Sequence, residues 1–225
     1  MTNYSQNLKD VQARIRQATR LAGREQNAVT LIAASKTQPR SALLDLLAAG
    51  QCHFGENRVQ EALEKFKELR AQHPEITIHL IGPLQTNKVK QAMALFDVIQ
   101  TIDRPELARK VALEAKKQGR CPRLFIQVNT GEEAQKAGIL PKDFSSLLAL
   151  CRDELDLKIE GLMCIPPVGS DPSIHFILLK NMAETHDIPH LSMGMSDDFE
   201  KAIACGATFV RIGTTLFGKR TLSMP

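Results

Sequence analysis

The stretch VTLIAASKTQPRSALLDLLAAGQCHFG, residues Val29–Gly55, contains one complete strand–helix–strand pattern. Val29–Ser35 is a continuous apolar run, which is typical of a strand buried on both faces. Ser41–Ala49 carries apolar residues at helical spacing, and Cys52–Gly55 is a second short apolar run. The stretch therefore predicts a βα unit whose next strand lies parallel to the first.

The same alternation continues along the chain. The predicted strands are Val29–Ser35, Cys52–Gly55, Ile76–Gly82, Asp97–Ile102, Leu124–Asn129, Ile159–Ile165, His190–Gly194 and Thr208–Gly213. The helical patterns between them are Ser41–Ala49, Val59–Leu69, Val89–Leu95, Pro105–Lys117, Pro141–Arg152, Ile174–Glu184 and Phe199–Cys205. Apolar residues spaced three to four apart from Leu8 to Ala22 predict a further amphipathic helix before the first strand.

Such a series of βα units can close into a barrel or form an open, doubly wound sheet. The count of eight strands favours the barrel. No Gly-x-Gly-x-x-Gly follows the first strand, which argues against the dinucleotide-binding open sheet. The 225 residues suffice for one barrel of this kind and leave no room for a second domain. We therefore expect an α/β protein with a single (β/α)8 TIM barrel domain, residues 1–225, and an extra N-terminal helix.

Composition restricts the classes of function. The net charge is +4, but the nine Phe and one Tyr form no stacking platform and no long Lys/Arg run occurs, so we expect no nucleic-acid partner. The absence of a spanning segment or secretory signal predicts a cytoplasmic protein without a membrane partner. The five cysteines form no CxxC pair, and no His cluster has metal-ligand spacing. We interpret them as buried thiols and expect no metal site.

Polar residues gather where the predicted strands end, and these ends carry the active sites of such barrels. They are Ser35-Lys36-Thr37, Glu56-Asn57, Gln85-Thr86-Asn87, Asn129-Thr130, Gly194-Met195-Ser196 and Arg211-Ile212-Gly213-Thr214. Any one of them could be an ordinary turn residue or helix cap. Their joint placement on one rim predicts a ligand site.

Two cationic residues on this rim suggest the kind of ligand. Lys36 follows a wholly apolar strand, so burial and cationic neighbours could lower its pKa and free its amine to form an imine with a carbonyl ligand. The alternative is a lysine that extends into water. Arg211 would be costly to bury without an acceptor. That acceptor could be a carboxylate or a pyridine ring nitrogen.

The ends of strands seven and eight are the frequent phosphate site of this fold. Gly194 and Gly213 would allow close approach of the backbone, and Ser196 and Thr214 would supply hydroxyl donors. Asp197 and Asp198 would suit the first turn of a helix in their own right, so Ser196 could instead be a simple N-cap.

Seven segments carry a resemblance to a known family. They are LIAASKTQP (Leu31–Pro39), HFGENRVQEAL (His53–Leu63), HLIGPLQTNKVK (His79–Lys90), IQVNTGEEAQKAG (Ile126–Gly138), GLMCIPP (Gly161–Pro167), LSMGMSDDFEKAI (Leu191–Ile203) and VRIGTTLFG (Val210–Gly218). Through them the chain resembles the pyridoxal phosphate homeostasis protein family, also called the proline synthetase co-transcribed homologue family, over nearly its whole length. That family is similar to the barrel half of alanine racemase.

The resemblance implies pyridoxal 5′-phosphate (PLP) as the cofactor. It implies an imine on Lys36, an arginine at the pyridine nitrogen at Arg211 and a contact near the ring at Asn57. The implied phosphate contacts are Ser196, Gly213 and Thr214. Some positions depart from the family pattern, with Arg58 in place of the usual tyrosine, Ala137 in place of serine and a short stretch between residues 167 and 191.

Two classes of function remain. The resemblance implies a carrier that buffers PLP or delivers it to PLP-dependent apoenzymes, without strong catalytic activity, and we expect a monomer. The alternative is a PLP-dependent racemase or decarboxylase. The resembled racemases use a tyrosine base from a second domain, whereas this chain has only Tyr4. A class I aldolase would place its lysine at the end of strand six, where the chain has Met163-Cys164-Ile165. We also expect Lys136, after strand five, to act as a secondary acceptor for the aldehyde.

Overall fold

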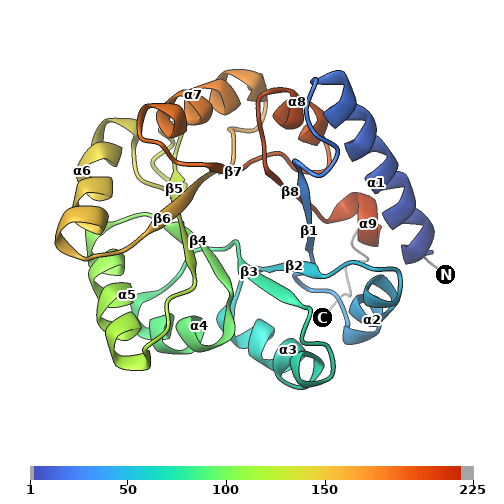
Figure 1. The fold of residues 1–225 in the computed structure, drawn as a ribbon, viewed down its shortest axis with the longest axis horizontal. Helices are drawn as coiled ribbons and strands as arrows, with labels where there is room; N and C mark the ends of the chain where they lie inside the picture. Colours follow the sequence, from blue (N-terminus) through green and yellow to red (C-terminus); the bar gives the residue numbers. More distant parts are fainter. Residues whose placement is uncertain (1–2, 219–225) are drawn as a thin grey trace.

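The computed structural model describes residues 3–218, and these residues form a closed eight-stranded barrel surrounded by helices (Figure 1). The strands follow one another around the barrel in chain order, and each pairs in parallel with the next. β8 closes the ring by pairing with β1 in the register Ile32↔Arg211 and Ala33↔Ile212. The prediction of a (β/α)8 barrel is confirmed.

All eight predicted strands form. Six are shorter than their apolar runs, while β2 and β5 keep the predicted length and are shifted by one residue. They are β1 (Thr30–Ala34), β2 (His53–Glu56), β3 (Thr77–Leu80), β4 (Val98–Ile102), β5 (Arg123–Val128), β6 (Ile159–Cys164), β7 (His190–Ser192) and β8 (Phe209–Ile212). The residues trimmed from the runs lie in the loops at the strand ends. The parallel arrangement brings the carboxyl ends of all strands to one face of the barrel, which we call the mouth.

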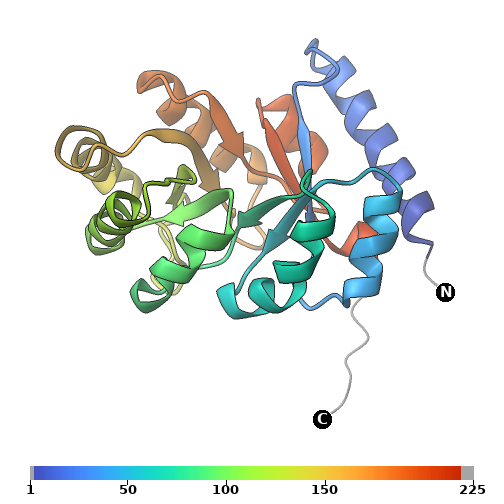
Figure 2. The ribbon, with the colours of Figure 1, turned by 60° about the horizontal axis from the view of Figure 1, so that its bottom comes forward.

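The helices lie outside the strands (Figure 2). They are α1 (Tyr4–Leu21), α2 (Arg40–Ala48), α3 (Val59–Gln72), α4 (Val89–Leu95), α5 (Pro105–Gln118), α6 (Phe144–Ala149), α7 (Pro172–Thr185), α8 (Phe199–Ala204) and α9 (Thr214–Phe217). Short helical turns adjoin two of them: η1 (Thr86–Lys88) precedes α4, η2 (Pro141–Asp143) precedes α6, and the π-helical turn η3 (Leu150–Glu154) follows α6. The sequence did not predict α9, whose four residues are too few for a periodic pattern.

Apolar packing occurs in two layers. Leu and Phe side chains fill the space between the strands and the helices, for example Phe54 of β2 against Phe66 of α3 at 5.8 Å between ring centroids. Inside the barrel, Ile32, Val98 and Phe125 form a separate small cluster with Phe209. The apolar faces predicted from helical spacing therefore point toward the strands.

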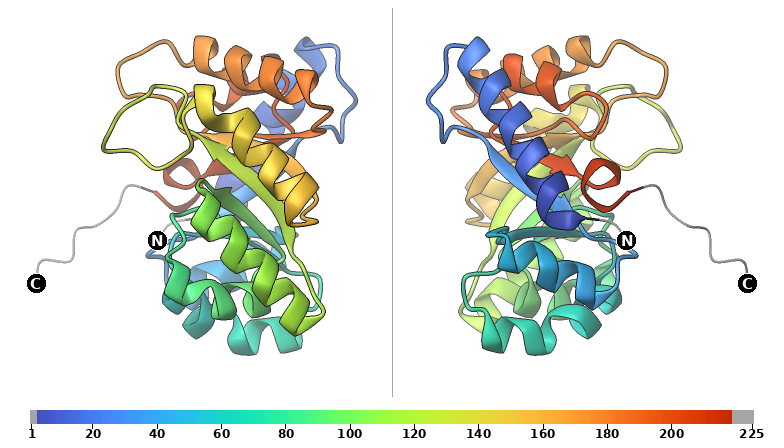
Figure 3. Two further views of the ribbon diagram at one scale, coloured as in Figure 1. Left: turned by 90° about the vertical axis from the view of Figure 1, so that its left-hand side faces the viewer. Right: turned by 90° about the vertical axis from the view of Figure 1, so that its right-hand side faces the viewer.

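The extra N-terminal helix also forms as predicted. α1 lies across the outside of the barrel beside α2, α8 and α9 (Figure 3). Asn3 caps it by accepting a hydrogen bond from the backbone N–H of Gln6 at 3.0 Å. Its buried residues Leu8, Val11 and Ile15 belong to the predicted apolar face.

The cysteines agree only in part with the prediction. All five are free thiols, and Cys151 and Cys164 are buried, which raises the pKa of their thiols to about 11 and about 12. The expectation of burial is wrong for Cys121, which is exposed, and only partly right for Cys52 and Cys205. The absence of CxxC pairs indicated free thiols, but their spacing could not show which of them are buried.

Candidate cofactor site

The six candidate residues all lie at or near the mouth of the barrel. Lys36 follows β1, Asn57 follows β2 and Ser196 follows β7. Arg211 lies within β8, while Gly213 and Thr214 begin the turn into α9. A Cβ atom on Gly213 would lie 3.4 Å from the backbone oxygen of Ala34, so the start of α9 is next to the end of β1. The closure of the barrel thus brings the predicted phosphate donors close to the segment that carries Lys36.

A buried ion pair supports the residue before Lys36. Ser35 Oγ donates to Glu56 Oε1 at 2.7 Å, and Lys65 Nζ of α3 donates to the backbone oxygen of Ser35 at 2.8 Å. Lys65 Nζ also lies 3.1 Å from Glu56 Oε1. The Glu56 side chain is wholly buried, and burial raises the pKa of its carboxyl although Ser35 and Lys65 oppose the rise. The end of β1 is therefore fixed against α3.

Thr37, the residue after Lys36, is held by Lys65 through a second carboxylate, that of Glu61. The backbone N–H of Thr37 donates to Glu61 Oε1 at 2.5 Å, and Lys65 Nζ lies 2.6 Å from that oxygen. Thr37 has φ 62°, a left-handed conformation that costs a residue other than glycine about 1 kcal/mol. The hydrogen bond to Glu61 supports this conformation. The half-buried Lys36 is thus anchored on both sides.

Arg211 is buried and has neutral hydrogen-bond partners. Its side chain is only 4% exposed. Nη1 donates to Ser192 Oγ at 2.7 Å, and Nη2 donates to the backbone oxygen of Cys164 at 2.8 Å. Within residues 3–218, no carboxylate forms an ion pair with it, although Asp198 acts on it through space. Burial lowers the pKa of Arg211, but a guanidinium stays charged at neutral pH.

This arrangement bears on the two acceptors considered for Arg211. Among the described residues no carboxylate pairs with Arg211, and its guanidinium has more N–H donors than its two partners use. A neutral ring nitrogen at the mouth would supply the missing acceptor. The donor set therefore fits a pyridine ring.

The loop after β7 is built for close packing. Gly194 has φ 90°, and a Cβ atom there would lie 2.5 Å from Ala202 Cβ. The N-cap of α8 is Asp198, not Ser196, and its Oδ1 accepts a hydrogen bond from the backbone N–H of Met195 at 2.6 Å. Ser196 Oγ instead faces the start of α9, where it lies 3.5 Å from the backbone nitrogen of Thr215. The simple N-cap interpretation of Ser196 is wrong.

Asn57 is half-buried at the end of β2. A Cβ atom on Gly82 would lie 2.4 Å from the backbone oxygen of Asn57, so the loop after β3 packs directly against it. The adjoining Arg58 is exposed, and its side chain does not cap α3. The contact between Asn57 and the ring stays a prediction.

Lys136 lies in the loop after β5, on the mouth side as expected. Its Nζ lies 2.6 Å from Glu133 Oε2 and donates to the backbone oxygen of Pro166 at 3.2 Å. These contacts connect the loops after β5 and β6. The amine must leave both partners before it can attack an aldehyde.

Several site residues were missed from sequence. Glu61 and Lys65 lie four residues apart on α3, a spacing that indicates a helix ion pair but not its contact with the β1 loop. His79, Gln100 and Ser192 are polar residues inside apolar strands, and they lie buried in the barrel interior. Their position within apolar runs was the available signal.

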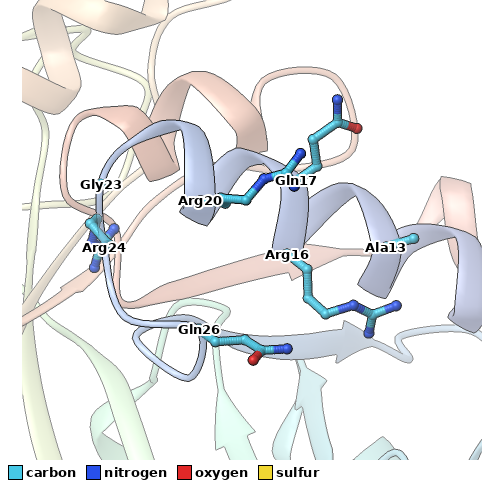
Figure 4. A pocket seen from close by; sticks show the side chains of 7 residues that line it. All are labelled: Ala13, Arg16, Gln17, Arg20, Gly23, Arg24 and Gln26. Carbon is cyan, nitrogen blue, oxygen red and sulfur yellow. The ribbon is translucent and has the colours of Figure 1, made fainter.

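A surface cavity lies away from the mouth. It has a volume of about 730 Å³ and is lined by α1 and the loop that leads to β1, with Arg16, Arg20 and Arg24 on its wall (Figure 4). Arg24 donates to the backbone oxygens of Ile203 and Ala207 at 3.0 Å and 2.8 Å. Its guanidinium thus joins this loop to the turn after α8, a structural role.

Neither a metal-ion cluster nor a membrane-spanning helix occurs among the described residues. Within residues 3–218, no group of three or more His, Cys, Asp or Glu side chains is arranged to hold a metal ion. Across the same range, every helix is too short or too polar to cross a bilayer.

Known proteins match this chain over nearly its full length. Residues 6–221 match the family model of the alanine racemase N-terminal domain. A Vibrio cholerae protein named pyridoxal phosphate homeostasis protein is 38% identical over 99% of both chains. A Pseudomonas aeruginosa protein of the same name is 39% identical, over 100% of this chain and 99% of the other.

Solved structures give the same result. PipY of Synechococcus elongatus, solved without PLP, is 37% identical and has a TM-score of 0.85 over 95% of this chain and 99% of its own. The structure of PipY with PLP bound has a TM-score of 0.78 over 91% of this chain and 100% of its own. Alanine racemase of Clostridium difficile is 15% identical with a TM-score of 0.71, over 98% of this chain and 58% of its own, and shares the barrel fold. The chain therefore belongs to the pyridoxal phosphate homeostasis protein family.

Proposed function

We propose that this chain binds PLP covalently through Lys36 and holds it for buffering or for delivery to PLP-dependent apoenzymes. The observation that carries the proposal is the mouth of the barrel, where the anchored Lys36 segment lies beside the start of α9 and Arg211 has spare donors. The names of the relatives and the PLP-bound structure of PipY support the choice of ligand. When bound, PLP would supply an aldehyde, with which the Lys36 amine would form a C=N bond with release of water.

The residues of this chain have distinct parts in the proposal. Lys65 and its two carboxylates hold the segment that carries Lys36 in place. Arg211, whose Nη1 donates to Ser192, would donate a free N–H to the ring nitrogen. Ser196, Gly213 and Thr214 hold the phosphate, and Asn57 contacts the ring. Arginine cannot give up its proton at neutral pH, so the ring nitrogen stays uncharged and withdraws electrons less strongly than a protonated ring.

We further propose that the protein is a cytoplasmic monomer and a carrier without strong turnover. Its one tyrosine, Tyr4, packs edge-on against Phe217 with ring centroids 6.0 Å apart. This contact supports a packing role for Tyr4 instead of a role as the opposing base of a racemase. A carrier also needs an exchangeable ligand, whereas racemisation requires acid and base groups on both faces of the substrate.

Two assays test the proposal. PLP added to the apoprotein should produce an absorption change that Lys36→Ala greatly reduces. Lys142→Ala, a variant of a lysine in η2, should retain it. The PLP-loaded protein is then incubated with a panel of L-amino acids while chirality and carbon dioxide release are followed. Turnover near the ordinary enzyme range of roughly 1–10³ s⁻¹ would support the racemase or decarboxylase alternative and contradict the carrier.

A further inference from the structure

A chain of hydrogen bonds crosses the interior of the barrel from Arg211 toward the opposite end. Arg211 Nη1 lies 2.7 Å from Ser192 Oγ, which lies 2.6 Å from Gln100 Oε1. Gln100 Nε2 is 3.1 Å from His79 Nδ1, and His79 Nε2 is 3.1 Å from His53 Nδ1. These five residues, here called the polar chain, come from β8, β7, β4, β3 and β2.

The polar chain has only one consistent direction. A guanidinium only donates, so Ser192 Oγ accepts from Arg211 and uses its hydrogen to donate to Gln100 Oε1. The Gln100 amide nitrogen must then donate to His79 Nδ1, which places the hydrogen of His79 on Nε2. His79 in turn donates to His53 Nδ1. The charge of Arg211 therefore fixes the donor and acceptor role of every later group.

Reversal of this direction would be costly because its surroundings are apolar. Ser192, Gln100 and His79 are wholly buried, and the Phe209 ring lies 5.8 Å from the His79 ring. If the Gln100 amide were flipped, the Ser192 hydroxyl hydrogen would lose its acceptor, and a buried unpaired polar group is unfavourable. The orientation of Gln100 is thus fixed from both ends.

The two histidines are neutral in this environment. Burial holds the pKa of His79 well below its usual value, and the nearby His53 and Arg123 lower it further. Burial and Arg123 also lower the pKa of His53, while Asp97 partly raises it. A neutral His53 can accept the last hydrogen bond, as the direction of the polar chain requires.

We propose that Gln100 is a positioning residue for the cofactor, because through Ser192 it fixes the guanidinium of Arg211 in the orientation that presents its free N–H donors to the ring nitrogen. The inference rests on the proposed function, in which PLP occupies the mouth. Gln100 does not touch the ligand. It holds Ser192 Oγ in place as an acceptor, and Ser192 together with the Cys164 oxygen sets the plane of the guanidinium.

The test measures how well the protein recognises the ring nitrogen. Affinities are compared for PLP and for its 1-deaza analogue, in which a CH group replaces the ring nitrogen. A hydrogen bond from a charged donor predicts that the wild type prefers PLP by about 10- to 100-fold. Gln100→Leu should reduce this preference to about threefold or less, while both ligands still bind.

A matched control separates positioning from general destabilisation. Gln51 is also a buried glutamine, and its Nε2 donates to the backbone oxygens of Leu31 and His53 at the amino ends of the strands. Gln51→Leu should lose stability but keep the full preference for PLP. An unchanged preference in folded Gln100→Leu, or an equal loss in both variants, would overturn the inference.

A measurement on the wild type covers the case in which Gln100→Leu does not fold. The ¹⁵N resonances of the imidazoles should show His79 as the neutral tautomer with its hydrogen on Nε2 at pH 7. A hydrogen on Nδ1 would mean that the polar chain runs the other way, and the inference would fail. A wild type that does not distinguish the deaza analogue would refute the role of Arg211 and this inference, while covalent attachment at Lys36 would still stand.

Discussion

Replacement of Lys65 by methionine removes the central cation beside Lys36. Lys65 Nζ makes three contacts, with Ser35 O at 2.8 Å, Glu61 Oε1 at 2.6 Å and Glu56 Oε1 at 3.1 Å. The Lys65 side chain is 12% exposed and that of Glu56 is 0% exposed. Lys65→Met therefore leaves a buried carboxylate without its counter-ion, a change that destabilises proteins strongly.

The size of the loss follows from the ability of Glu56 to take up a proton. Protonation at pH 7 of a carboxyl with an ordinary pKa of 4.5 costs about 3.4 kcal/mol, and at pH 5 it costs about 0.7 kcal/mol. A neutral Glu56 avoids the penalty of a buried charge, so the cost of its protonation accounts for most of the expected loss of stability, to which the lost hydrogen bond from Lys65 to Ser35 O adds. We expect Lys65→Met to lower the free energy of unfolding by about 3–4 kcal/mol at pH 7 and about 1 kcal/mol at pH 5.

Urea unfolding at both pH values measures this difference. Lys65→Met combined with Glu56→Gln should recover most of the loss, because no charge is then buried. The matched control is Arg40→Met, which breaks an ion pair with Glu68 whose side chains are 40% and 72% exposed, and it should cost under about 1 kcal/mol. A loss for Lys65→Met that is below about 1 kcal/mol at pH 7, or that is the same at both pH values, would refute this reasoning.

Three further predictions concern acid stability, the phosphate and Lys136. The pKa of His79 is lowered by folding, so the unfolded chain binds the extra proton, and the stability from this group is lost as the pH falls through 6.5, by about 1 kcal/mol between pH 6.5 and 5.5. Urea unfolding at these two pH values should show a smaller fall for His79→Gln, and an equal fall would contradict the assignment. Thr214→Val should weaken PLP binding by about tenfold and leave pyridoxal binding unchanged, and equal affinity of the wild type for both aldehydes would show that the phosphate site is misplaced. Lys136→Ala should slow cofactor transfer to an apoenzyme, and a wild-type transfer rate would remove the proposed role of Lys136 as a secondary acceptor.

Much of the fold could be predicted from periodicity, because parallel strands buried on both faces are apolar throughout. The run Ile159–Ile165 is an example, since β6 occupies Ile159–Cys164. α9 could not be predicted, because Thr214–Phe217 is shorter than a periodic pattern. The predicted helix Pro141–Arg152 forms as three consecutive pieces, η2, α6 and η3. The spacing of apolar residues predicts a helix there but not its division into turns of different type.

The candidate site was predictable where one residue has a distinctive position. Lys36 and Arg211 could be selected because a charge follows or interrupts an apolar strand. The residues that hold Lys36 and Arg211 in place could not be assigned from sequence. The hydrogen bonds from Lys65 to Ser35 and from Ser192 to Gln100 join segments that are far apart in the chain. Ser196 was open to two interpretations, and the position of Asp198 as the N-cap of α8 decides between them.

The identity of the lysine that binds PLP is the central claim. The freshly purified protein is loaded with PLP, reduced with borohydride and digested, and the peptides are analysed by mass spectrometry. We expect the pyridoxyl group on the peptide that contains Lys36. The Lys36→Ala protein should carry far less label under the same conditions, with any remainder on Lys136, the proposed secondary acceptor. A pyridoxyl group found only on another lysine of the wild-type protein, such as Lys136, would contradict the claim.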